Sequence, residues 1–409
     1  MQYFTTPTIS LGFFSAISAS AFIYMSHLGL HAPWLQAFLG MAALFAWLRI
    51  PVPAMAWSGF FTGIFWFWWI GMSFRYYDLG WMIPLIVLSI GGVYGIVFWL
   101  LSLLRHPLMR AAGVGLIEFL HPFGFDWFRP ALLFTGSVLG DSLWQLWTVL
   151  AALALFLSFR HPGRYAALLL IPLALHRPPA EDLHSEASAL KRQIQLTRTN
   201  IDQGNKWKPR YRNAIVELNL HAIDLAVEQG KRAVILPESA FPLYLNLDID
   251  LIRKLLKMSR RITIVTGALY YEKGNAYNST YLFRKEKLRV MHKVVLVPFG
   301  EAVPLPKWIG HWINDLFFDG ASDYRTASRP SDFEMLGRKW RNAICYEATC
   351  ERLYEEDPRY MVALSNNAWF IPSTEPTLQR LLLQLQANRH KTIIFHATNG
   401  PITDVIVPQ

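Results

Sequence analysis

The sequence has 409 residues, of which 53% are hydrophobic and 17% charged, and its formal net charge is +10. Only seven Arg and four acidic residues precede residue 177, so a single uniformly water-soluble domain is excluded and two domains are expected, at residues 1–178 and 190–409. A nucleic-acid partner is disfavoured because the basic residues of the second domain alternate with acids and no nucleic-acid motif is visible. The positive charge suits a surface that works against anionic phospholipid headgroups.

The first domain is a series of apolar stretches, several of which reach the roughly 20 residues that a helix needs to cross a bilayer. Tryptophan and tyrosine crowd the edges of these stretches, as in FWFWWIGMSFRYYDLGW (65–81), which is typical of aromatic belts at the membrane interface. We predict a multi-span helical membrane domain with about seven spans. The stretches lie near residues 8–27, 34–50, 52–74, 80–104, 109–125, 131–158 and 164–176.

The arginines of the first domain predict its orientation. If the N-terminus is cytoplasmic, most of them fall in cytoplasmic loops, while Arg75 and Arg129 fall in outer loops, each with an Asp nearby. This asymmetry follows the positive-inside rule. An odd number of spans then places the second domain outside the cytoplasm, which in a bacterium is the periplasmic side of the inner membrane. The inner-loop arginines are Arg49, Arg105, Arg110, Arg160 and Arg164.

The polar, proline-containing segment 176–193 is predicted to be a linker. After it, short apolar strands alternate with amphipathic helices, and this pattern predicts sheets with helices packed on their faces. The helices are expected at 211–229, 250–261 and 376–391. The strands are expected in QIQLTRTNI, RAVILPE, ITIVTGALYY, STYLF, VVLVPF, NAICYE, MVALSNNAW, TIIFHATN and ITDVIV.

Three reactive residues lie far apart in this second domain, in strand-like contexts: Glu238 in ILPESAFP, Lys293 in HKVVLVPFGEAVP and Cys345 in NAICYE. A thiol is nucleophilic only as the thiolate, a carboxylate can take its proton, and an ammonium can stabilise both the thiolate and an oxyanion. The three residues can therefore carry out acyl transfer through a thioester. The twelve His show no metal-type spacing, and neither a metal nor an organic cofactor is expected.

These motifs, together with SNNAWF (365–370) and HATNG (396–400), resemble the nitrilase superfamily. More narrowly, NIDQGNKW (200–207) and IEFLHPFGFDW (117–127) make the chain similar to the apolipoprotein N-acyltransferase family. The resemblance implies an α/β nitrilase-like domain, an α-β-β-α sandwich, that follows a membrane domain. It also implies transfer of an acyl chain from a phospholipid, usually phosphatidylethanolamine, to the α-amine of a diacylated lipoprotein, beside the lipid bilayer.

Roles for individual residues follow from the same resemblance. Cys345 is the expected nucleophile, Glu238 the general base and Lys293 the electrostatic stabiliser. Supporting positions are expected at Glu301, Glu347, Tyr346 and Trp207, with Trp207 as an aromatic wall of the site.

Two further residues have structural interpretations. Cys350 lies five residues after the proposed nucleophile, and we expect it to be free and buried, because a disulfide would consume Cys345. Glu118 is an acid within an apolar stretch, where acids are costly. Such acids are often functional and the family pattern has a Glu here, but we favour a structural role for Glu118.

The sequence departs from the family pattern in three places. The segment WFIPSTEPTLQR (369–380) lacks the Gly and His expected after the Trp-Phe pair, the loop between IEF and DW is compressed, and the family's final membrane helix is not found before VIVPQ (405–409). The aromatic segment 307–324 fits either a core helix or a membrane-facing lid. Two other functions stay open: a membrane-tethered carbon-nitrogen hydrolase, in which water replaces the amine, and a non-catalytic lipoprotein-binding scaffold.

Overall fold

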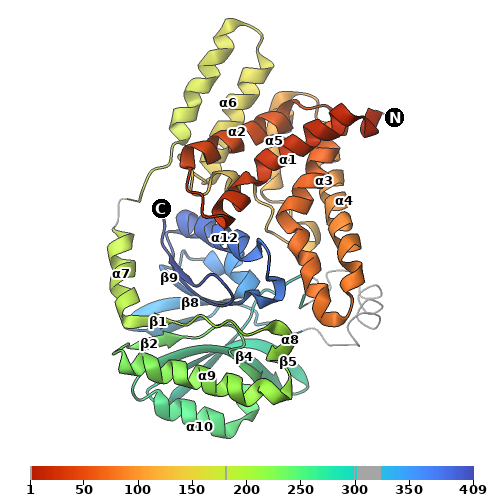
Figure 1. Cartoon of the computed structure of the whole chain (residues 1–409). Helices are drawn as coiled ribbons and strands as arrows, with labels where there is room; N and C mark the ends of the chain where they lie inside the picture. The colour runs from red at the N-terminus through yellow and green to blue at the C-terminus, as the bar shows by residue number, and fades with distance from the viewer. Residues whose placement is uncertain (1, 180–181, 299, 302–323) are drawn as a thin grey trace.

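The computed structural model describes residues 2–179, 182–298, 300–301 and 324–409. Helices make up the first part of the chain and an α/β unit makes up the rest (Figure 1). All seven predicted apolar stretches contain helix, and the runs Thr6–His27 and Gly80–Ser102 are long and apolar enough to cross a membrane. The principal helices of this part are α1 (Thr6–His27), α2 (Pro33–Arg49), α3 (Val52–Phe67), η2 (Trp68–Tyr77), α4 (Ile83–Ser102), α5 (Pro107–Ile117), α6 (Leu143–Ser158) and η6 (Pro162–Ala174).

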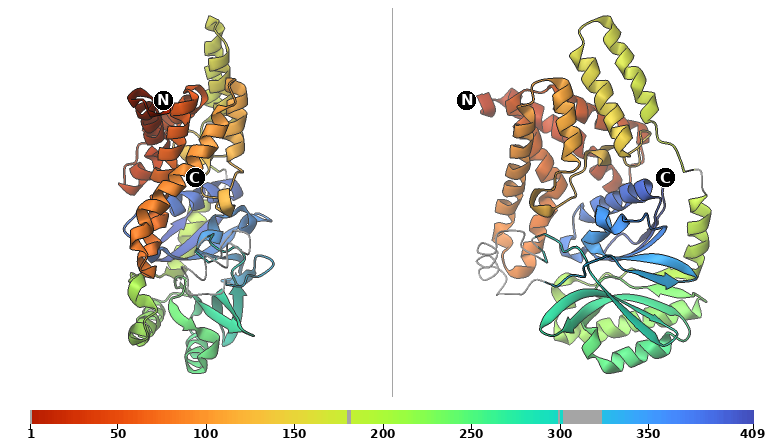
Figure 2. Two further views of the ribbon diagram at one scale, coloured as in Figure 1. Left: turned by 90° about the vertical axis from the view of Figure 1, so that its right-hand side faces the viewer. Right: turned by 180° about the vertical axis from the view of Figure 1, so that it is seen from behind.

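Helices α3 and α4 approach each other closely because glycine lies at their contact. A Cβ atom on Gly59 would lie 2.4 Å from the carbonyl oxygen of Tyr94 and 2.5 Å from Cβ of Phe98. Small residues at such contacts let two helix backbones pack tightly in an apolar setting. The pair formed by α6 and η6 projects beyond the other helices (Figure 2).

The aromatic residues of segment 65–81 do not all form the predicted interfacial belt. Trp66 and Trp69 are buried, and their rings lie 4.7 Å from Phe128 and 4.9 Å from Phe370, respectively. The belt interpretation is therefore wrong for these two residues, which fill the core between the helices and the α/β unit. Composition alone does not distinguish an aromatic ring at a lipid interface from one inside a protein core.

The α/β unit contains two sheets. The first has the order β1-β2-β4-β5-β6, with β3 paired to β4, and the second has the order β11-β10-β9-β8-β7. The strands of the first sheet are β1 (Ile194–Leu196), β2 (Ala233–Ile235), β3 (Phe241–Tyr244), β4 (Thr263–Glu272), β5 (Asn275–Arg284) and β6 (Lys287–His292). Those of the second are β7 (Asp332–Met335), β8 (Arg338–Ile344), β9 (Tyr360–Asn366), β10 (Ile393–Asn399) and β11 (Asp404–Ile406).

The sheets pack face to face, and helices cover their outer faces (Figure 1). Helices α9 (Pro209–Glu228) and α10 (Ile249–Met258) cover the first sheet, and α12 (Glu375–His390) covers the second. Strand alternation explains these layers: in β2, Ile235 packs between the sheets and Val234 packs toward α9 and α10. The predicted α-β-β-α sandwich is confirmed.

Helix α12 also joins the sandwich to the membrane-type helices. In β9, Val362 points between the sheets, whereas Met361 belongs to the apolar core that α12 shares with α1 through α6. His27 of α1 lies 3.0 Å from Thr377 of α12, measured between Nδ1 and Oγ1. The second sheet is therefore held directly beneath the helical part.

The predicted strands need two corrections. Residues 294–297 of VVLVPF are not a strand, because the backbone N–H groups of Val294 and Val295 donate to the Glu347 carboxylate instead of to a neighbouring strand. Strands β3, β6 and β7 were not expected. Most of segment 307–324 lies outside the described residues.

The predicted linker 176–193 contains helix α7 (Leu183–Gln193). Its apolar positions Leu183, Ala187 and Leu190 recur at helical spacing and are buried in the core between the sheets. The polar composition of the segment hid this narrow apolar stripe.

Candidate active site

Glu238 follows the carboxyl end of β2, where the backbone turns sharply. Ser239, the next residue, has φ +47°, and Pro237 accepts a hydrogen bond from the Gly267 N–H at 3.1 Å. A Cβ atom on Gly267 would lie 2.6 Å from Cα of Glu238. Position 267 must therefore be glycine, because the turn that carries Glu238 passes too close for a side chain.

Cys345 occupies the matching place after β8. Its φ is +55°, a left-handed conformation that costs a non-glycine residue about 1–3 kcal/mol and recurs at functional sites. The residue is partly exposed, and Nε2 of Gln379 lies 4.0 Å from its Sγ. Burial of the sulfur and the negative charge of Glu238 raise the pKa of the Cys345 thiol well above its usual range, and Lys293 opposes this effect. The resting thiol is therefore neutral and needs a base.

Lys293 follows β6 and is fully buried. Its Nζ lies 2.6 Å from Oε2 of Glu301, and Glu301 also accepts a hydrogen bond from the Val297 N–H at 2.9 Å. Burial disfavours the ammonium, but the negative groups around it, led by Glu301 and Glu238, outweigh burial and raise the Lys293 pKa. Lys293 is thus a permanent positive charge in this site.

Glu347 anchors the backbone on both sides of the site. Its carboxylate accepts N–H hydrogen bonds from Val294 at 2.7 Å, Val295 at 2.9 Å and Ile344 at 2.9 Å. It is fully buried, and burial raises its pKa to about 7 although Lys293 and these donors oppose the shift. The residue ties the chain after Lys293 to the end of the strand that precedes Cys345.

The three widely spaced residues of the sequence analysis come together. Asn278 bonds to both Glu238 and Glu301, and Glu301 pairs with Lys293. Glu347 joins the backbone after Lys293 to the residue before Cys345. Each residue follows the end of a strand, β2 and β6 in the first sheet and β8 in the second, where a short turn can hold a side chain rigidly.

Tyr346 contacts the helical part of the chain, whereas Trp207 is exposed. The hydroxyl of Tyr346 accepts the Asp126 N–H at 3.0 Å and donates to the Gly124 carbonyl at 3.1 Å, so it binds the helical part of the chain. Its ring stacks on Phe125. Trp207 follows α8 (Gln203–Lys206) and is 39% exposed, which leaves it open to a ligand.

The motifs SNNAWF and HATNG contact each other and α8 through a network of side-chain amides. Asn399 donates to Asn366 at 2.8 Å, and Asn366 donates to Gln203 at 2.8 Å. Asn399 also accepts the Ile201 N–H at 2.8 Å. The network fixes the loop that carries Lys206 and Trp207.

Glu118 and Cys350 lie outside this constellation. Glu118 is fully buried, bonds to Arg389 at 2.8 Å and accepts the Ala131 N–H at 3.1 Å, which supports its structural interpretation. Cys350 is free and buried, as predicted. Its Sγ lies 3.8 Å from Oδ1 of Asp126.

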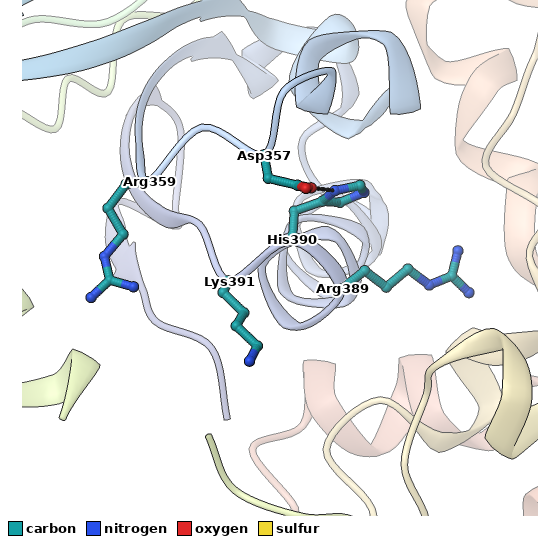
Figure 3. Close-up of a pocket in the computed structure, with 5 residues that line it drawn as sticks. All are labelled: Asp357, Arg359, Arg389, His390 and Lys391. Atoms are coloured by element: carbon teal, nitrogen blue, oxygen red, sulfur yellow. Dashed lines mark hydrogen bonds and ion pairs between the residues drawn. The ribbon is translucent and has the colours of Figure 1, made fainter. Parts of the chain in front are cut away.

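A pocket of about 330 Å³ lies at the other end of α12 (Figure 3). It is lined by Asp357, Arg359, Arg389, His390 and Lys391. About 10 residues of helix, or roughly 15 Å, separate Arg389 from Gln379, the α12 residue near Cys345. Within the described ranges no group of three His, Cys, Asp or Glu could hold a metal ion.

Four residues of the site were not identified from the sequence. Asn278 donates to Oε1 of Glu238 at 2.7 Å and to Oε1 of Glu301 at 3.0 Å. Lys206 is buried and donates to the Glu238 carbonyl at 3.1 Å. The polar run Asn-Ser-Thr inside β5 was a signal for Asn278, whereas Glu375 and Gln379 looked like ordinary residues of an amphipathic helix.

Comparison with known proteins agrees with this architecture. Residues 6–177 match the model of the apolipoprotein N-acyltransferase integral membrane domain. An apolipoprotein N-acyltransferase of Wolinella succinogenes is 43% identical over 409 residues, which cover 99% of this chain and 97% of that protein. One of Helicobacter pylori is 36% identical, covering 92% and 88%.

Among solved structures, an amidase from Nesterenkonia sp. AN1 is similar at 15% identity and a TM-score of 0.38, covering 53% of this chain and 85% of that one. The full-length similarity to the Wolinella protein and the match of the membrane domain together assign the family. The chain belongs to the apolipoprotein N-acyltransferase family.

Proposed function

We propose that this protein transfers an acyl chain from a phospholipid, through a thioester on Cys345, to the N-terminal α-amine of a diacylglyceryl-Cys lipoprotein. The observation that carries this proposal is the meeting of Glu238, Lys293 and Cys345 at the ends of separate strands, held by the contacts of Asn278, Glu301 and Glu347. The names of the full-length relatives support the acyl acceptor. Phosphatidylethanolamine is the proposed donor.

In the first half-reaction Glu238 takes the proton of the Cys345 thiol as sulfur attacks the ester carbonyl of the donor. The carbonyl electron pair moves onto oxygen, and the Lys293 ammonium stabilises the resulting oxyanion. When this intermediate collapses, the carbon–oxygen bond to the lysophospholipid breaks and its oxygen takes the proton from Glu238. An acyl thioester remains on Cys345.

In the second half-reaction the neutral α-amine of the lipoprotein attacks the thioester. Glu238 takes a proton from the nitrogen, the carbon–sulfur bond breaks, and the proton returns to the sulfur. The products are the amide and the free thiol. Glu301 and Glu347 act by positioning Lys293 and the backbone beside Cys345.

We further propose that residues 1–178 form the membrane domain and residues 190–409 a catalytic domain on the periplasmic side of the bacterial inner membrane. The excess of arginine in the predicted cytoplasmic loops supports this orientation. A reporter active only in the periplasm, fused after Gln409, tests it. Activity of a cytoplasm-only reporter at the same position would show that the catalytic domain lies on the cytoplasmic side instead.

The test of the chemistry is intact-mass measurement of the full chain after incubation with phosphatidylethanolamine and no acceptor. One added acyl mass that hydroxylamine removes is expected. Cys345→Ser should lose the hydroxylamine-sensitive adduct and Cys350→Ala should retain it. A hydroxylamine-sensitive adduct on the Cys345→Ser protein would refute the nucleophile.

A further inference from the structure

Glu375 is a buried acid that the proposed half-reactions do not use. It is the first residue of α12 and is 2% exposed. Its Oε2 has no hydrogen-bond partner among the residues that the structure describes. A buried carboxylate without a partner is costly, so this position favours the neutral acid.

Glu375 lies on the face of α12 that approaches Cys345. Gln379 lies one helical turn further on and therefore on the same face. Its Nε2 is 4.0 Å from Sγ of Cys345, and its Oε1 accepts a hydrogen bond from Asn367 at 3.0 Å. Glu375 in its ionised form would raise the pKa of the Cys345 thiol, so the two side chains lie close to each other.

Glu238 and Glu375 thus face one thiol in opposite surroundings. Glu238 accepts a hydrogen bond from Asn278 at 2.7 Å. Glu375 lacks such a donor, and burial together with the charge of Glu238 raises its pKa well above its usual range. Two carboxyl groups whose surroundings differ in this way divide into a base and an acid.

We propose that Glu375, in its acid form, donates a hydrogen bond to the oxygen of the acyl carbonyl while Cys345 attacks it. The inference rests on the proposed acyl transfer and adds a catalytic residue to it. The sulfur–carbon bond forms, the carbonyl electron pair moves onto oxygen, and the thiol proton goes to Glu238. Glu375 keeps its proton throughout and acts with Lys293 on the oxyanion.

Two substitutions of similar volume separate this role from a structural one. Glu375→Gln keeps a hydrogen-bond donor, whereas Glu375→Leu fills the space without one. Loss of one donor to an oxyanion costs about 10²- to 10³-fold in rate. We expect acylation to slow about 100-fold in the Leu protein and less than 10-fold in the Gln protein. The Leu protein should unfold at the same temperature as the wild type or higher, since it no longer buries an unpartnered acid.

The experiment is single-turnover acylation of the full-length protein in mixed micelles of detergent and phosphatidylethanolamine, followed by intact mass. Gln384→Leu is the matched control, because Gln384 is buried on α12 but bonds to Val407 and Asn388. Absence of any adduct on the wild-type protein would refute the proposed function itself. With a normal wild-type rate, a Leu protein that acylates equally fast, or a Gln protein as slow as the Leu protein, would overturn the role of Glu375.

Discussion

Asn278 donates its side-chain amide to Glu238, with 2.7 Å between Nδ2 and Oε1. The same nitrogen lies 3.0 Å from Oε1 of Glu301, which is the ion-pair partner of Lys293. A single buried amide therefore links the proposed base to the carboxylate that holds the proposed electrostatic stabiliser. This hydrogen bond holds the Glu238 carboxyl group in place beside the ion pair of Lys293 and Glu301.

We predict that Asn278→Ala slows acylation of Cys345 by about 10- to 100-fold, since a hydrogen bond to a charged group contributes about 1.5–3 kcal/mol. Single-turnover acylation measures this effect. Asn275→Ala, in the same strand but bonded to Arg325, is the control and should leave the rate unchanged. An unaltered rate in the Asn278→Ala protein would mean that Glu238 needs no such donor.

The sequence predicted those parts of the fold that follow from apolar periodicity. Strands β2, β4, β8, β9 and β10 are buried on both faces, and their apolar runs marked them clearly. Strand β6 was missed because its sequence KLRVMH is half polar and lies at a sheet edge. The strand expected in VVLVPF is absent at residues 294–297 because a distant carboxylate, Glu347, takes the backbone donors that a strand would use.

The reactive residues could be selected because their chemistry is rare in strand-like surroundings. Asn278, Lys206 and Glu375 could not, because amide, ammonium and carboxyl groups are usually solvated and only the fold shows that these are buried. The segment 369–380 departed from the expected pattern in sequence, and the structure places its Glu375 and Gln379 on the helix face beside Cys345. The sequence could not show that this segment lies next to Cys345, because the two are far apart along the chain and meet only in the fold.

Lys206 gives a pH-dependent prediction. Burial lowers its pKa to about 8, against the opposing charges of Glu238 and Cys345. The unfolded chain then binds this proton more tightly than the folded one, so the contribution of Lys206 to the free energy of unfolding rises as pH increases from about 8 to about 10.5. We expect any stability advantage of Lys206→Met to be largest below pH 8 and to shrink above it.

Thermal unfolding of the Lys206→Met and wild-type proteins from pH 6 to pH 10 measures this difference. Lowering the Lys206 pKa from 10.5 to about 8 corresponds to roughly 3 kcal/mol of unfolding free energy between low and high pH. Lys208→Met is the control, because the neighbouring Lys208 is exposed. A difference between Lys206→Met and wild type that does not vary with pH would show that Lys206 is charged in the folded protein across the whole range.

Tyr346 tests whether a residue next to the nucleophile acts in chemistry or in assembly. Its hydroxyl satisfies the Asp126 N–H and the Gly124 carbonyl in the helical part. Tyr346→Phe keeps the ring stacking but leaves the Asp126 N–H unpaired, which should destabilise the protein by about 1–3 kcal/mol. We expect acylation at low temperature to stay within a few-fold of wild type.

Thermal unfolding and single-turnover acylation of the Tyr346→Phe protein separate the two roles, with Tyr211→Phe on α9 as the control. A large fall in the acylation rate at unchanged stability would instead assign the hydroxyl to the chemistry. That result would contradict its placement against residues 124–126.

The choice between transferase and hydrolase rests on what discharges the thioester. Water at about 55 M would outcompete an amine unless the acyl-enzyme is kept dry. The α/β unit is covered on the α12 side by the apolar core of the helical part, and Trp69 and Phe370 pack together within it. A hydrolase requires no such cover and no second lipid-binding step.

We therefore predict that the acyl-enzyme survives in buffer for much longer than one catalytic cycle and discharges rapidly when a diacylated lipopeptide with a free α-amine is added. The lysophospholipid must leave before the acceptor enters, so the steady-state kinetics should be ping-pong. Acetylation of the α-amine should stop discharge, because the nucleophile is then removed while the lipid part of the acceptor is unchanged. Intact mass of the protein follows loss of the thioester, and release of free fatty acid shows how much of that loss is hydrolysis. Rapid release of fatty acid that does not depend on the lipopeptide would favour the hydrolase, since a thioester open to water cannot wait for an amine.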